Sequence, residues 1–133
     1  MSSGFIHDPV DGIAMLLWAA DPATPHLLAT PFFQAAAAAA MEIPVEIYFT
    51  AASVRLLLPG VAETLRASPH HDKTILDAMH EAVSHGAKFY ACTDALHAQG
   101  IAGLPLIAEC SGRGGAVQFM ARATSLRWRA LVF

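Results

Sequence analysis

Charged side chains are scarce in this sequence of 133 residues. They make up 14% of the chain, against roughly 25% in an average soluble domain, while 55% of the residues are hydrophobic. The alanine run at 35–40 raises the hydrophobic share, and we also expect apolar surface to be buried between subunits of a homo-oligomer. The length suits one compact core, so we expect residues 1–133 to form a single domain.

Basic clusters and long apolar runs are both missing. Eight basic and eleven acidic residues give a net charge of -3, and no group of Lys or Arg is placed to neutralise a series of phosphates, which argues against nucleic acid as a partner. The apolar stretch at 13–20 is broken by Asp21 and Pro22, and no run reaches membrane-spanning length. Residues 1–9 lack the basic start of an export signal. We therefore expect a cytoplasmic protein without a membrane segment.

Cysteine is rare as well, and metal-binding motifs are not found. Two cysteines, Cys92 and Cys110, are too few for a disulfide framework, and a reducing compartment leaves them as free thiols. The seven histidines form no HExxH pattern, and His80 and His85 are five residues apart, a spacing that does not share a helix face. We expect neither a resident metal nor a cofactor.

What the chain does have is an alternation of short apolar runs with helical patterns. Predicted strands lie at 12–19, 45–50, 87–91, 106–110 and 128–133. Predicted helices lie at 24–41, 61–67, 72–85, 93–100 and 116–124, and the stretch 51–58 is ambiguous. Strands that alternate with helices indicate βαβ units. The fold class is therefore α/β, a three-layer α/β/α sandwich with a mainly parallel five-stranded sheet.

Three local features refine this prediction. Pro31 should kink the first helix or restart it with Thr30 as a second N-cap, because proline removes a backbone donor. Asp72 is placed to cap the third helix. The glycine-rich residues 111–115 precede a helix, a position at which backbone N–H groups can bind an anion. They lack the Lys-Ser/Thr of a phosphate-binding loop, so a plain tight turn is expected.

Cys92 is the strongest candidate for chemistry. In parallel α/β folds, reactive groups gather beyond the carboxyl ends of the strands, and Cys92 directly follows the predicted strand 87–91. The start of a helix stabilises a thiolate, although Asp94 opposes a second negative charge. Cys110 ends the next predicted strand and could serve as a resolving thiol, but simple packing is the more economical role, because a disulfide needs Cα atoms within about 7 Å.

Several stretches in a fixed order carry a resemblance to a known family. They are residues 30–32 with the alanine run 35–40, 46–50, 54–58 with Gly60, 86–92, and 114–116 leading to the last strand. Together they resemble the DsrE/DsrF-like family. The sharpest element is Phe89-Tyr-Ala-Cys92. The resemblance implies that Cys92 accepts sulfur as a persulfide and passes it to a small sulfur carrier of the TusA type, and that the protein is a trimer or hexamer.

Two other readings stay open from the sequence. The first is a non-catalytic binding or structural subunit of an oligomeric complex, in which the thiol of Cys92 is inert. The second is a thiol redox protein that uses Cys92 and Cys110 together. Sulfur loading separates the relay from both alternatives, while a reversible intramolecular disulfide would favour the redox protein.

Overall fold

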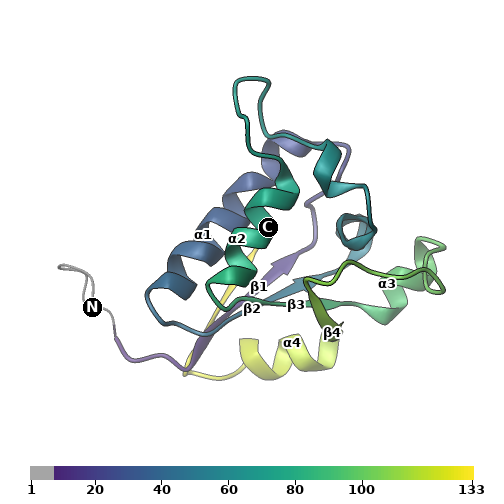
Figure 1. The fold of residues 1–133 in the computed structure, drawn as a ribbon. Coiled ribbons are helices and arrows are strands. Elements are labelled where there is room, and N and C mark those ends of the chain that lie inside the picture. Colours follow the sequence, from purple (N-terminus) through teal and green to yellow (C-terminus); the bar gives the residue numbers. More distant parts are fainter. Residues whose placement is uncertain (1–7) are drawn as a thin grey trace.

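A computed structural model describes residues 8–133, so most of the segment 1–9 that was assessed for an export signal lies outside the described residues. One sheet of five strands runs through the centre of the molecule in the order β4-β3-β2-β1-β5 (Figure 1). The strands are β1 (Gly12–Leu17), β2 (Val45–Phe49), β3 (Lys88–Ala91), β4 (Cys110–Arg113) and β5 (Trp128–Val132). Every pairing is parallel, so the predicted five-stranded sheet is confirmed and is wholly rather than mainly parallel.

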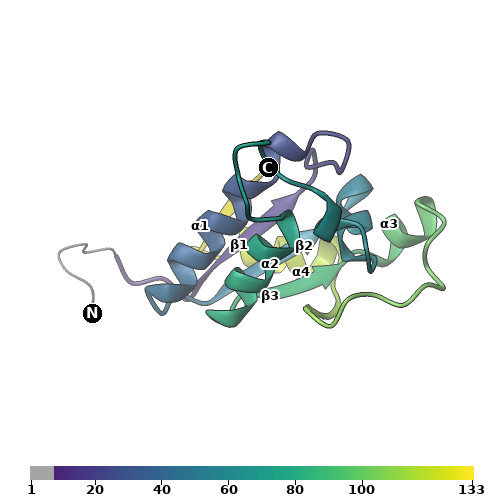
Figure 2. The ribbon, with the colours of Figure 1, turned by 45° about the horizontal axis from the view of Figure 1, so that its top comes forward.

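Helices cover both faces of this sheet. Helices α1 (Ala29–Ala40) and α2 (Ile75–Ser84) pack side by side on one face, and α4 (Ala116–Ala123) lies on the other (Figures 1 and 2). The short helix α3 (Thr93–Ala98) follows β3, beyond the carboxyl end of that strand. The predicted three-layer α/β/α arrangement is therefore confirmed. Within residues 8–133, no helix has the length and apolar character needed to span a bilayer.

The larger core lies between the sheet and the α1/α2 layer. Alternate residues of each strand point into it, because successive side chains of a strand face opposite sides of the sheet. Phe49 of β2 and Phe89 of β3 meet with ring centroids 5.1 Å apart, and Phe32 of α1 packs on both, at 6.1 and 5.8 Å. All three rings are fully buried. This aromatic cluster fixes α1 over the middle of the sheet.

The opposite face has a much smaller core, because α4 is the one helix within residues 8–133 that covers it. Ala14, Tyr48 and Phe119 form its buried centre. Apolar side chains around that centre stay open to solvent, among them Met120 at 50% exposure and Val132 at 60%. Incomplete cover of this face leaves room for a surface pocket.

The first predicted helix differs from the observed one. Residues 24–41 contain a separate 3₁₀ turn, Pro25–Leu27, and α1 begins only at Ala29. Pro31 lies in the first turn of α1, where a backbone N–H has no partner within the helix, so it causes no kink. The residue at the N-cap is Leu28, without a side-chain cap, so the prediction that Thr30 caps a restarted helix is wrong.

Two further helix predictions are corrected. Thr74, not Asp72, caps α2, and it forms a capping box in which Asp77 N–H donates to Thr74 Oγ1 at 3.1 Å and Thr74 N–H donates to Asp77 Oδ2 at 2.9 Å. The predicted helix 61–67 is a single 3₁₀ turn at Ala62–Thr64. The ambiguous stretch 51–58 forms the 3₁₀ helix Ala51–Leu57.

The fourth strand is displaced along the chain. It was predicted at 106–110, but β4 spans Cys110–Arg113 and so includes most of the residues that were expected to form a tight turn. The apolar residues 106–108 come before this strand. The backbone N–H of Ile107 donates to the carbonyl of Leu57 at 2.8 Å rather than to β3. Apolar character alone did not locate this edge strand.

Candidate functional site

Cys92 lies at the junction that the sequence predicts, immediately after β3 and at the N-cap of α3. Its backbone is held on both sides: the Cys92 N–H donates to the carbonyl of Phe49 at 2.9 Å, and its carbonyl accepts from the N–H of Leu96 at 3.0 Å. The residue is half-buried, and its thiol is free. The ends of β2 and β3 and the start of α3 therefore fix the backbone of Cys92, which limits the positions that its sulfur can take.

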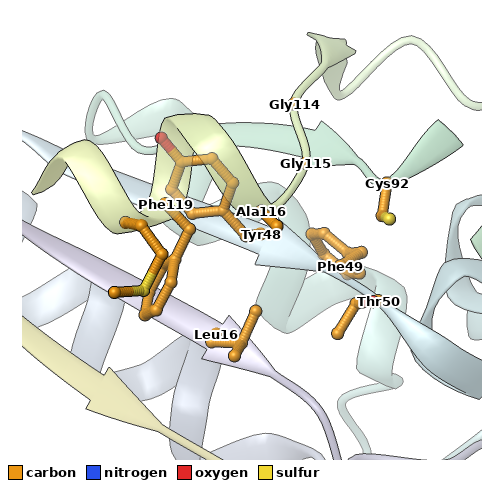
Figure 3. Close-up of a pocket in the computed structure, with 10 residues that line it drawn as sticks. Leu16, Tyr48, Phe49, Thr50, Cys92, Gly114, Gly115, Ala116 and Phe119 are labelled. Atoms are coloured by element: carbon orange, nitrogen blue, oxygen red, sulfur yellow. The ribbon is translucent and has the colours of Figure 1, made fainter. Parts of the chain in front are cut away.

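A pocket of about 280 Å³ opens beside Cys92 on the α4 side of the sheet (Figure 3). Its floor is made by the ends of β1 and β2, and its wall by the turn before α4 and the first turns of that helix. The lining residues are Leu16, Tyr48, Phe49, Thr50, Cys92, Gly114, Gly115, Ala116, Phe119 and Met120. Cys92 stands at one end of this group and Phe119 at the other (Figure 3).

Gly114 lets the turn before α4 approach the sheet closely. Its N–H donates to the carbonyl of Ala91 at 3.1 Å, which ties the turn to the end of β3. A Cβ atom at this position would lie 3.1 Å from Cβ of Tyr90 and 2.9 Å from Oε1 of Gln118, closer than ordinary contact. A side chain at Gly114 would therefore push the wall of the pocket away from Cys92.

A partly buried ion pair anchors α4, and nothing in the sequence indicates it. Glu46 on β2 is only 8% exposed, although it is charged. Arg122 of α4 donates to both of its carboxylate oxygens, from Nε to Oε1 at 2.9 Å and from the guanidinium Nη2 to Oε2 at 3.1 Å. The hydroxyl of Tyr48 donates to Oε1 at 2.6 Å. A charge-assisted pair of this geometry holds the helix in one position on the sheet.

The titration of these groups follows from their surroundings. Burial would raise the pKa of Glu46, but the hydrogen bonds from Arg122 and Tyr48 and the nearby positive charges of Arg122 and Lys88 outweigh it, so the pKa of Glu46 lies below its ordinary value. Burial and the hydrogen bond to Glu46 both raise the pKa of Tyr48. Tyr48 therefore stays protonated and keeps its hydroxyl turned to Glu46.

Trp128 extends the anchor to the neighbouring edge of the sheet. The Arg122 guanidinium lies 4.2 Å from the centre of the Trp128 ring, at the start of β5. Tyr48 also packs between Tyr90 and Phe119, with ring centroids 5.5 and 5.6 Å away. The floor and the wall of the pocket are thus joined by Tyr48, whose ring lines the pocket and whose hydroxyl belongs to the ion pair.

Cys110 does not lie beside Cys92 at the carboxyl edge of the sheet. Its predicted position at the end of a strand would have allowed this. It begins β4 and pairs in register with Phe89 of β3, which lies three residues before Cys92. At about 3.3 Å per residue, the two cysteine Cα atoms lie roughly 10 Å apart, beyond the span of a disulfide. Cys110 Sγ lies 3.4 Å from the Gly112 carbonyl and packs against the core. The geometry argues against a paired resolving thiol.

The remaining candidates contribute no second site. Asp94 is exposed in the first turn of α3. His80 lies 3.2 Å from the carboxylate of Glu109, on the α2 side of the molecule. Among residues 8–133, no three His, Cys, Asp or Glu side chains are grouped so that they could hold a metal ion.

Comparisons with known proteins agree with this architecture. A family model described as the DsrE/DsrF-like family matches residues 14–126. The fold is similar to that in the crystal structure of the ychN protein from E. coli, with a TM-score of 0.72 and 18% sequence identity. The match covers 92% of this chain and 99% of that one. No curated protein matches the chain significantly.

Proposed function

We propose that this chain, which belongs to the DsrE/DsrF-like family, is a sulfur-relay protein that accepts sulfane sulfur as a persulfide on Cys92 and passes it on. One observation carries the proposal: among the residues that line the pocket at the carboxyl edge of the sheet, Cys92 supplies the sole thiol. The carboxyl edge is where parallel α/β folds place their chemistry. The open pocket gives a second thiol access to the sulfur once it is loaded.

The proposed reaction consists of two thiol exchanges. The Cys92 thiolate attacks the terminal sulfur of a donor hydropersulfide, a new S–S bond forms at Sγ, and the donor leaves as a thiolate with the electrons of the broken S–S bond. The thiolate of an acceptor then attacks the terminal sulfur on Cys92 and restores the Cys92 thiolate. The transferred sulfur keeps its oxidation level throughout, so no redox cofactor is needed.

The proposal also covers the acceptor, the compartment and the oligomeric state of the protein. The acceptor would be a small sulfur carrier of the TusA type in the cytoplasm, and residues 1–133 would act as one DsrE-like domain. The chain would assemble as a homo-oligomer, a trimer or hexamer. Exposed apolar side chains outside the pocket lining, such as Trp18 at 65% exposure and Leu27 at 56%, support a subunit interface.

Loading by a sulfane donor tests the function. Reduced protein is incubated with inorganic polysulfide, and its intact mass is expected to rise by whole sulfur atoms. Cys92→Ser should abolish the gain, because a hydroxyl cannot hold transferable sulfur, whereas the matched variant Cys110→Ser should load like wild type. A loaded protein should return to its original mass when a second thiol is added.

The result also separates the proposal from its rivals. If the wild type takes up no sulfur from any sulfane donor, or if Cys92→Ser loads equally well, the relay is wrong and a non-catalytic binding or structural subunit becomes the better account. A reversible intramolecular disulfide between Cys92 and Cys110 would point to a thiol redox protein. The separation of roughly 10 Å between their Cα atoms disfavours that outcome.

A further inference from the structure

We infer that the pocket beside Cys92 selects sulfur donors that carry an uncharged apolar group, such as alkyl hydropersulfides, over anionic donors. The inference rests on the proposed function, because it concerns the donor in the first thiol exchange. It arises from what lines the pocket and from where the nearby charges are directed.

The lining of the pocket is almost entirely apolar. None of its ten residues carries a formal charge. The hydroxyl of Tyr48 is turned to Glu46 and is occupied by that carboxylate at 2.6 Å. Thr50 and Cys92 supply the remaining polar side-chain groups of the lining. An apolar donor group that enters the pocket therefore covers apolar surface at little cost in lost polar contacts.

The arginines of α4 and β4, Arg122 and Arg113, are engaged or directed elsewhere. The guanidinium of Arg122 is held by Glu46 and stacked on Trp128. Arg113 pairs in register with Ala91, whose side chain belongs to the core beneath α1 and α2. Residues paired in register share a face, so Arg113 projects to the face opposite the pocket. A donor such as polysulfide or glutathione hydropersulfide would lose hydration here without gaining an ion pair.

The chemical step places the donor group in the pocket. The Cys92 thiolate attacks the terminal sulfur of R–S–SH, the donor S–S bond breaks, and R–S⁻ leaves while the hydrogen stays with the transferred sulfur. The group R must lie near Cys92 at that moment, and the pocket is the concave surface that adjoins this thiol. Binding of R there holds the donor sulfur within reach of Sγ.

A series of alkyl hydropersulfides, from methyl to butyl, measures this selection. Their leaving thiolates are of similar basicity, so differences in the second-order rate of Cys92 loading report binding of the alkyl group. Full burial of one methylene corresponds to about a fourfold gain, and half burial in this open pocket should give about a twofold gain per added carbon. Glutathione hydropersulfide and inorganic polysulfide serve as the charged donors, and N-acetylcysteine in place of the protein corrects for intrinsic donor reactivity.

Two variants on α4 provide a matched comparison. Met120→Lys places a charge in the pocket lining, and Val117→Lys places the same charge on the same helix at an 87% exposed position outside that lining. Met120→Lys should flatten the dependence on chain length and raise the relative rate with polysulfide. Val117→Lys should keep the wild-type pattern.

The outcomes distinguish this inference from the proposed function. If every donor loads Cys92 at a rate that is independent of alkyl length, or if charged donors load faster after correction, the inference is overturned while the relay stands. The same holds if the two lysine variants behave alike. If no donor loads Cys92 at all, the proposed function itself falls.

Discussion

Replacing Arg122 with methionine should destabilise the protein and loosen the wall of the pocket. Methionine keeps most of the aliphatic length of arginine but removes the two donors that bind Glu46. Glu46 would then remain in the sheet as a buried carboxylate with Tyr48 as its hydrogen-bond donor. The loss of one partner of a buried ion pair is costly because the other charge stays desolvated.

The size of the effect depends on how deeply the pair is buried. Truncation of one partner in a fully buried pair costs about 3–5 kcal/mol. The side chain of Glu46 is 11% exposed but that of Arg122 is 38% exposed, so solvent screens part of the interaction. We therefore expect a loss of about 2 kcal/mol in the free energy of unfolding. At roughly 3–5 °C per kcal/mol for a chain of this size, the Tm should fall by about 6–10 °C.

Urea denaturation across a range of pH gives the most specific readout. In the wild type the folded-state pKa of Glu46 is lowered, so the stability it contributes is present above pH 4.5 and is lost as the pH falls through the folded pKa. In Arg122→Met, the burial of Glu46 raises its pKa instead, so protonation relieves the unpaired charge. The stability difference between the two proteins should therefore shrink as the pH falls from the raised pKa of Glu46 in the variant, above 4.5, to its lowered pKa in the wild type, below 4.5.

A surface arginine provides the control. Arg127 pairs with Asp11 at 3.1 Å, with both side chains more than half exposed, and Arg127→Met should cost less than about 1 kcal/mol. Equal losses in the two variants, or a loss for Arg122→Met that does not change with pH, would refute the view that Glu46 and Arg122 anchor α4.

Three further predictions follow from the same structure. Brief iodoacetamide treatment with peptide mapping should label Cys92 before Cys110, since Cys92 borders the pocket while Cys110 Sγ lies against backbone carbonyls; faster labelling of Cys110 would contradict this. Gly12→Ala should cost about 1–3 kcal/mol in thermal or urea unfolding, because its Cβ would lie 2.5 Å from the Trp128 ring, whereas Gly103→Ala, with nothing within 4 Å, should be nearly neutral. Light scattering at micromolar concentration should show a homo-oligomer, a trimer or a multiple of it, and a monomer would refute that expectation.

Much of the fold could be predicted because its signals are local. The strands β1, β2, β3 and β5 are apolar or aromatic runs bounded by turn residues, and their predicted ranges overlap the observed ones. The position of Cys92 follows from two such neighbours, a strand and a helix that begins directly after it. The resemblance to the DsrE/DsrF-like family, which depended on the order of several weak stretches, is confirmed by a match over residues 14–126.

The errors and omissions arise where distant residues decide the structure. Glu46 and Arg122 are 76 residues apart, and nothing near either of them in sequence marks them as partners. The residues just before β4 are held by a distant partner, since the N–H of Ile107 donates to the carbonyl of Leu57, and β4 pairs with β3 only from Cys110 onward. The position of Cys110 was left open for the same reason: β4 begins rather than ends at Cys110, so this residue lies at the amino end of its strand.

The uneven cover of the sheet connects the pocket with the proposed relay. A relay thiol must be held rigidly, yet it must stay open to a donor and then to an acceptor. On the α1/α2 face, two helices and an aromatic cluster seal the sheet and fix the ends of β2 and β3 that hold the Cys92 backbone. On the other face, α4 is a single eight-residue helix that leaves the pocket open beside the thiol. If α4 could shift on the sheet, the pocket would lose its shape, so the partly buried pair of Glu46 and Arg122 helps to keep an accessible site well defined.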